Sequence, residues 1–336
     1  MFSTCTWSPS IRAATPPTSV PVRASDKPAL EPLPFAERVL KNGLRAITLE
    51  DHRSATVSVN VAYRVGGKDD PPERSGFAHL FEHLMFKGTK TTGAETIDRL
   101  TEDVGGFNNA YTTEDYTNYY EVVPSNYLEP ILWAEADRLG GLVVDQANFA
   151  TERDVVIGEY DQRILAEPYG MLGELVQREA YRVHPYRRGV IGDPENLRAA
   201  TLEDVRAFHA TYYRPDNATL IVVGDFETPQ VDEWIDRYFA EVPRPAGAIP
   251  RVTAFEPPQA GERRLRYPSP NAPLPALHFA WHIPSAGDDD MPALDLIETL
   301  LGVGKSSRLY RALVYEHQIA TSAWAGADWS EQPGLF

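Results

Sequence analysis

Alternating hydrophobic and polar positions predict several strands in the first two thirds of the chain. Residues 55–67 alternate between apolar and polar side chains and predict a half-buried strand that ends at two glycines. Asn42-Gly43 separates two shorter extended runs, which is a typical hairpin signal. Residues 107–124 predict two further strands, and residues 217–226 predict a buried one.

Helical periodicity predicts the elements between these strands. A short helix is expected over 75–86, with Ser75 as its N-cap and Gly88 just beyond its end. The other predicted helices cover 96–106, 126–142, 149–168, 170–182, 202–212 and 228–243. Residues 243–264 are irregular and rich in proline, so they are the predicted interdomain linker.

The sequence after the linker is similar to a stretch before it. Residues 60–89 and 278–306 both predict a strand, an Asp-rich loop with proline, and an amphipathic helix that ends in glycine. Glu82 aligns with Glu298, but Asp295 and Thr299 stand where the first copy has histidines. We interpret the chain as a duplicated unit. Its predicted parts are a disordered leader without a secretory signal (1–34), a first domain (35–242), the linker (243–264) and the start of a second domain (265–336).

Composition narrows the possible functions. The chain has 336 residues, of which 43% are hydrophobic and 24% charged, as in a soluble globular protein. It has no apolar run of about 18 residues, so we expect no membrane span. The net charge of −16 argues against nucleic acid as a partner. Because Cys5 is the single cysteine, a metal would have to be held by histidine and carboxylate.

Two histidines in the helix predicted over 75–86 suggest a metal site. His79 and His83 are four residues apart, so they lie on one helical face and can bind one cation. With Glu82 they form H-x-x-E-H, the reverse of the H-E-x-x-H zinc signature. A catalytic zinc keeps three protein ligands and a water, and Glu82 could take a proton from that water. Packed or solvated histidines are the alternative, which the intervening glutamate makes less favoured.

The residues alone do not decide which side chain would be the third metal ligand. Glu152 and Glu159 are seven apart in the predicted helix 149–168, nearly on one face. Either could bind a metal, although a glutamate in a long helix more often faces water. A second pair, His278 and His282, alternates in a predicted strand and fits a half-buried strand better than a metal site.

Several stretches, in the same order, resemble the pitrilysin/insulinase/mitochondrial processing peptidase family of metallopeptidases, and a bacterial zinc protease most of all. They cover about 40–225 and read KNGLR, GFAHLFEHLMFKGT, GGFNNAYTTEDYTNYYEVVP, ERDVVIGEY, HPYRRGVIGD and YYRPDNATLIVVGDF. The resemblance implies a zinc endopeptidase that cleaves peptides or unfolded segments. A bacterial periplasm and a cytoplasm both stay open as compartments.

The resemblance also implies roles for individual residues. The family places its third zinc ligand, a glutamate, about 76 positions after the second histidine, which here is Glu159. By resemblance, His79, His83 and Glu159 bind one Zn²⁺, and Glu82 is the general base. Glu152 matches an acidic position that the family keeps near the metal, behind the ligands.

The implied fold is α/β: an antiparallel sheet covered by helices, with two such units closing on a peptide. Asn109 and Ala110 would lie on an edge strand to which the substrate adds.

The second unit ends about 70 residues after its start, so we expect a fragment without the family's substrate-clamping Arg and Tyr. Its partner would be a second homologous subunit or the rest of the C-terminal half. The alternative function is a non-catalytic, peptide-binding partner subunit.

Overall fold

The computed structural model describes residues 31–336, so the predicted leader lies almost wholly outside the described residues. Residues Phe35–Phe336 form one compact unit. The elements in chain order are β1 (Ala36–Val39), β2 (Arg45–Glu50), β3 (Thr56–Tyr63), α1 (Phe77–Leu84), α2 (Thr96–Glu102), β4 (Phe107–Thr112), β5 (Thr117–Pro124), α3 (Leu128–Gly141), α4 (Gln146–Tyr160), α5 (Met171–Ala180), α6 (Pro194–Ala199), α7 (Leu202–Tyr212), β6 (Ala218–Gly224), α8 (Thr228–Phe239) and α9 (Met291–Gly302).

The strands form one six-stranded sheet in the order β1-β2-β6-β3-β5-β4. Four of the neighbouring pairs are antiparallel, as predicted, but β2 and β6 are parallel. The reason is topological. A short loop reverses the chain between β2 and β3, and β6 inserts between them after a long helical excursion. Since β6 runs antiparallel to β3, it must run parallel to β2.

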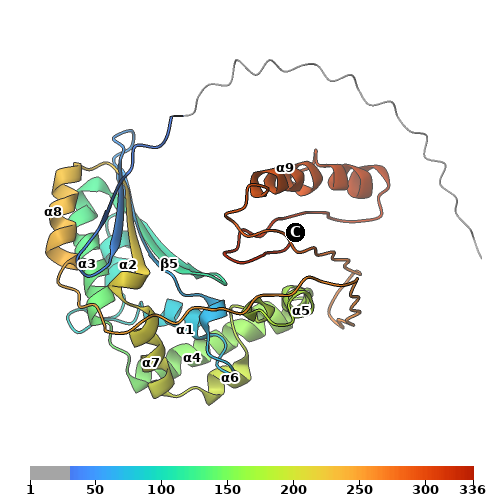
Figure 1. The fold of residues 1–336 in the computed structure, drawn as a ribbon, viewed down its shortest axis with the longest axis horizontal. Helices are drawn as coiled ribbons and strands as arrows, with labels where there is room; N and C mark the ends of the chain where they lie inside the picture. The colour runs from blue at the N-terminus through green and yellow to red at the C-terminus, as the bar shows by residue number, and fades with distance from the viewer. Residues whose placement is uncertain (1–30) are drawn as a thin grey trace, which may run out of the picture. The chain divides into compact units, whose positions relative to one another are not determined.

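One face of the sheet forms the core. Along β3, Val57, Val59, Val61 and Tyr63 are buried and alternate with half-buried or exposed residues, as the period-two pattern predicts. Helices α3 and α8 pack together on one side of the sheet (Figure 1). The resulting mixed α/β architecture, a sheet covered by helices, agrees with the predicted fold class.

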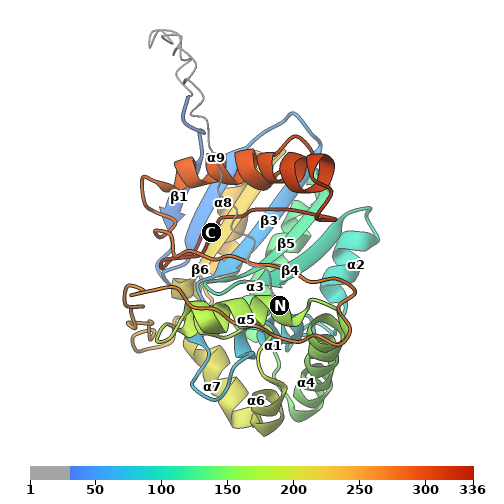
Figure 2. The same cartoon turned by 90° about the vertical axis from the view of Figure 1, so that its right-hand side faces the viewer.

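Helices α1, α4 and α7 gather at one end of the strands, as Figures 1 and 2 show. Helix α1 contacts both β4 and β5, and it also contacts α4 and α7. Helix α4 starts at the cap Asp145 and ends at Tyr160, followed by a π-helical turn over Asp161–Ala166. The predicted helix 149–168 is thus divided, and α6 is a short helix that the periodicity did not predict.

The second predicted unit is only partly regular. Helix α9 lies where a helix was predicted, and residues 243–264 are irregular. The prediction of a strand that contains His278 and His282 was wrong, because the structure has only an isolated bridge between His282 and Leu335 there. A strand needs a neighbour along its length, and this segment pairs only with the short stretch 334–336. The duplication and the domain boundaries stay predictions.

A buried lysine joins residues of the second predicted unit to the first. The Lys68 Nζ donates to Asp115 Oδ1 at 2.7 Å and also to Glu331, and its side chain is 6% exposed. Asp115 accepts two more hydrogen bonds, from the Tyr186 hydroxyl at 2.5 Å and from the Glu331 N–H at 2.8 Å. A buried charge is costly unless it is paired, so these contacts hold Glu331 beside the turn between β4 and β5.

Beneath α1, His209 is half-buried in an aromatic stack and is a source of acid sensitivity. Its ring stacks on Phe81 and Tyr213, and its buried Nε2 has no hydrogen-bond partner in the described part of the chain. Burial lowers the pKa of His209 from 6.5 to about 4. Below about pH 6.5 the unfolded chain therefore binds a proton that the folded chain takes up only near pH 4. Acid thus favours unfolding across this window.

We expect His209→Phe to remove the contribution of His209 to the pH dependence of folding stability. Because a shift of one pKa unit corresponds to about 1.4 kcal/mol, the wild-type chain should lose up to about 3 kcal/mol more stability than the variant between pH 6.5 and pH 4. Urea unfolding at a series of pH values measures the difference. Parallel stability curves for the two proteins would contradict the assignment.

Candidate metal centre

Helix α1 carries the histidines, and a loop aspartate caps its start. Gly76 precedes the helix at φ 95°, a left-handed conformation that favours glycine. A Cβ at Gly76 would also lie 2.8 Å from the Ile191 carbonyl oxygen. The buried carboxylate of Asp70 accepts hydrogen bonds from the Gly76 N–H at 2.5 Å and the Ala78 N–H at 2.9 Å. The expectation that Ser75 is the N-cap was wrong, since its hydroxyl instead accepts from Asp193 and Asn196.

Three predicted site residues converge between α1 and α4. The His79 Nε2 lies 3.7 Å from Glu159 Oε2, and the His83 Nε2 lies 3.4 Å from the same oxygen. One donor atom of each residue lies within 4.8 Å of the others, and the two imidazole rings are nearly perpendicular. The apolar neighbours of the histidines in α1, Leu80 and Phe81, are buried in the core and fix the side of the helix that faces α4.

These donors fit a zinc ion in type and spacing. Zinc binds nitrogen and carboxylate oxygen at about 2.0–2.2 Å, and two ligands of a tetrahedral ion at such distances are about 3.3–3.5 Å apart. The two separations from Glu159 Oε2, 3.4 and 3.7 Å, are close to this value. Within the described part of the chain, this is the group of histidine and acidic side chains with metal-binding spacing.

Burial sets the protonation of the histidine that is deepest in the site. His79 is 8% exposed, and this burial, aided by the neighbouring His83 and Arg163, lowers its pKa to about 3. His79 is therefore a neutral imidazole at neutral pH, which is the form that binds a metal. The Nδ1 of His79 is buried and has no hydrogen-bond partner among residues 31–336.

Glu152 and Glu159 take different places, although they share one face of α4. The buried Glu152 carboxylate lies 3.6 Å from His83 Nδ1, on the side of the ring away from Glu159, and pairs with Lys87 at 3.0 Å. Glu152 thus lies behind His83, and it is not among the three converging donors. The second oxygen of Glu159 pairs with Arg163 at 2.8 Å, which leaves Oε2 facing the histidines.

Glu82 borders the donor cluster and is held from the sheet. The Thr112 hydroxyl, at the end of β4, donates a hydrogen bond to Glu82 Oε2 at 2.6 Å. Burial raises the pKa of Glu82, while the hydrogen bond from Thr112 opposes that rise. Thr112 was not among the site residues predicted from the sequence. Its only signal was its place in FNNAYT, at the end of the strand predicted beside the site.

The strand with Asn109 and Ala110 is at the edge of the sheet. Within residues 31–336, β4 pairs only with β5, where Asn109 lies opposite Tyr120 and Ala110 opposite Tyr119. The Ala110 N–H donates to the Asn109 side-chain oxygen at 2.8 Å instead of to another strand. The edge of β4 that faces away from β5 thus has no neighbouring strand among the described residues.

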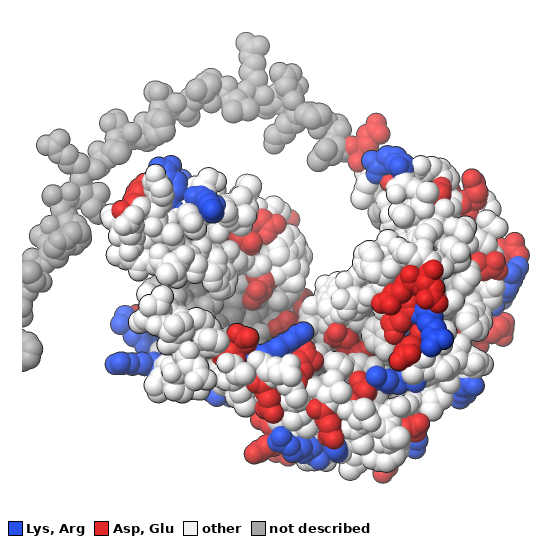
Figure 3. Space-filling model, turned by 180° about the vertical axis from the view of Figure 1, so that it is seen from behind, with Lys and Arg blue, Asp and Glu red and all other residues white. Residues whose placement is uncertain are grey.

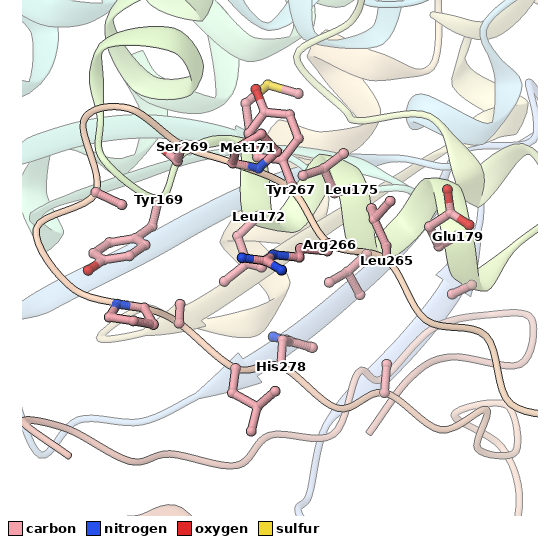
Figure 4. A pocket seen from close by; sticks show the side chains of 18 of the residues that line it. Tyr169, Met171, Leu172, Leu175, Glu179, Leu265, Arg266, Tyr267, Ser269 and His278 are labelled. Atoms are coloured by element: carbon pink, nitrogen blue, oxygen red, sulfur yellow. The ribbon is translucent and has the colours of Figure 1, made fainter. Parts of the chain in front are cut away.

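A separate cavity of about 700 Å³ lies between α5 and residues 259–282 (Figure 4). Leu172 and Leu175 line it from α5, and Leu265 and Tyr267 line it from the later segment. His278 and His282 border this cavity, but no third donor joins them among the residues described. This cavity is not lined by any of the four residues His79, Glu82, His83 and Glu159.

The charge of the described surface is mainly negative. The chain has 48 acidic and 32 basic residues. On the face seen in Figure 3, the acidic side chains gather in patches. A negative surface attracts cations and basic segments over a distance of about 10 Å at moderate salt. None of the described helices is long and apolar enough to cross a membrane.

Two family models match consecutive parts of the chain. The model described as "Insulinase (Peptidase family M16)" matches residues 45–194, which include His79, Glu82, His83 and Glu159. The model described as "Peptidase M16 inactive domain" matches residues 199–336. The histidine site therefore lies wholly in the part that matches the first model.

Named relatives and a solved structure agree with these matches. The chain is 34% identical over 296 residues to the zinc protease PqqE of Helicobacter pylori, covering 87% of this chain and 67% of that protein. It is 27% identical to a probable mitochondrial-processing peptidase subunit beta of Arabidopsis thaliana, covering 84% of this chain and 53% of that protein. The crystal structure of a protease from Helicobacter pylori superposes with a TM-score of 0.85 at 32% identity, covering 90% of this chain and 73% of that chain. The chain belongs to the insulinase family, peptidase family M16.

Proposed function

We propose that this chain is a zinc-dependent endopeptidase that hydrolyses peptides or unfolded segments. The observation that supports it best is the convergence of His79, His83 and Glu159, whose donor atoms lie within 4.8 Å of one another. Glu82 lies between the two histidines in α1, directly before His83. The names of zinc-protease relatives agree with this proposal.

Each residue has a distinct task in the proposed reaction. His79, His83 and Glu159 would hold the ion, and Glu152 would orient His83 through its Nδ1. Bound zinc supplies a Lewis acid in the site. Glu82 accepts a proton from the attacking water and then gives it to the leaving amine nitrogen. Its raised pKa, caused by burial, suits a group that must both take and return a proton.

The edge strand β4 suggests the form of the substrate. A peptide that adds to β4 by main-chain hydrogen bonds must be extended and must have free N–H and C=O groups. Folded proteins rarely offer such a segment. Asn109 and Ala110 would contact the peptide backbone, and the acidic surface favours basic peptides.

The test is cleavage of fluorogenic peptides by the purified chain. We expect hydrolysis that stops with a zinc chelator and returns when zinc is added back. The alternative, a non-catalytic peptide-binding partner, would bind the same peptides without cleaving them in any metal state. The intact set of His79, Glu82, His83 and Glu159 favours the peptidase.

A further inference from the structure

We propose that Thr112 is a positioning residue for Glu82, so that the strand offered to the substrate also fixes the general base. The inference rests on the proposed peptidase function. The Thr112 hydroxyl donates to Glu82 Oε2 at 2.6 Å, across 30 positions of sequence. Within the described residues, Thr112 is the one hydrogen-bond partner of this carboxylate.

The sheet itself holds the Thr112 hydroxyl in place. Thr112 ends β4 and lies opposite Thr117, the first residue of β5. The Thr117 hydroxyl is 3.4 Å from that of Thr112 and donates to the Val65 carbonyl at 2.9 Å. Thr117 is fully buried, so the ladder anchors the hydroxyl that reaches Glu82.

This geometry leaves the two oxygens of Glu82 with different tasks. Oε2 is occupied by Thr112, and Oε1 remains free to accept the proton of the attacking water. A glutamate has three side-chain torsions, and an untethered carboxylate would spend little time in the reactive orientation. Because a misplacement of about 1 Å can cost about 10²-fold in rate, the hydrogen bond is expected to act on turnover.

Thr112 also links the base to substrate binding. The same strand contains Asn109 and Ala110, whose free edge is the proposed peptide site. A peptide added to β4 would tighten the strand that carries the Thr112 hydroxyl. The position of the bound peptide and the orientation of the Glu82 carboxylate would thus both depend on β4.

The kinetic test uses three single variants of the zinc-loaded full chain. Thr112→Val keeps the side-chain shape but removes the hydroxyl, Thr112→Ser keeps the hydroxyl, and Thr56→Val makes the same change at the far end of β3. We expect Thr112→Val to lower kcat by roughly 10- to 100-fold with KM and zinc content unchanged. Thr112→Ser should restore most of the loss, and Thr56→Val should match wild type. A purely structural role would instead raise KM through damage to the edge strand.

A second measurement does not depend on turnover. Crystal structures of the zinc-loaded wild type and Thr112→Val would show the Glu82 carboxylate directly. We expect it beside Thr112 in wild type and rotated or disordered in the variant, with the zinc ligands unmoved. A carboxylate in the same position in both crystals would overturn the inference. An inactive wild-type chain would contradict the proposed function, and the crystals would still decide the role of Thr112.

Discussion

Replacing His83 with alanine is expected to abolish stoichiometric zinc binding. The wild-type chain should retain about one zinc per molecule, because two imidazoles and a carboxylate oxygen face one another at ligand spacing. His83→Ala removes one of three donors, and the loss in affinity should exceed the 10- to 100-fold typical of losing an outer hydrogen-bond partner. Metal analysis after dialysis, with competition against a chromophoric chelator, measures the effect.

The matched control is His317→Ala, because His317 is exposed and distant in sequence from the site. It should bind zinc as the wild type does. Circular dichroism should show that His83→Ala remains folded, since His83 is half-buried and lies at the end of α1. Equal zinc content in wild type and His83→Ala would show that the assigned ligand set is wrong.

Replacing Glu82 with glutamine is expected to separate metal binding from catalysis. The amide keeps the shape of the side chain and can still accept a hydrogen bond from Thr112, but it cannot take a proton from water. Zinc content should stay at the wild-type value. Peptide hydrolysis should fall by roughly 10²- to 10⁴-fold, which is the usual contribution of a general base.

Glu298→Gln provides the matched control for this change. Glu298 aligns with Glu82 in the predicted duplication, and it accepts a hydrogen bond from the Ala327 N–H at 2.9 Å. Glutamine can still accept that bond, so both hydrolysis and zinc content should stay at wild-type values. If Glu82→Gln cleaved peptides as fast as wild type, another group would have to be the base.

Local patterns were enough to predict the helix that carries the histidines. Its apolar residues recur at helical spacing, and the four-residue interval places His79 and His83 on one face whatever surrounds them. The strands were likewise predictable, because β3 buries every second residue. Such features depend on the geometry of one element, and a sequence contains that geometry directly.

The choice between Glu152 and Glu159 needed more than local pattern. Their seven-residue spacing gives both glutamates nearly the same direction from α4, and only family resemblance favoured Glu159 as the ligand. In the structure, the packing of α1 against α4 brings Glu159 Oε2 within 3.7 Å of both histidine Nε2 atoms and puts Glu152 beside the Nδ1 of His83. How two helices cross is a property of their packing, which neither helix encodes alone.

Contacts between distant segments were decided by tertiary structure alone. The parallel β2–β6 pair follows from where β6 inserts, and the cap of α1 comes from Asp70 because the preceding loop folds back on the helix. Thr112 reaches Glu82 only because β4 lies at the sheet edge against α1. The sequence by itself therefore determined the helices, most of the strands and the histidine pair, since each depends on short-range geometry. The tertiary structure determined the hydrogen-bond partners of the site, since these depend on how separate elements pack.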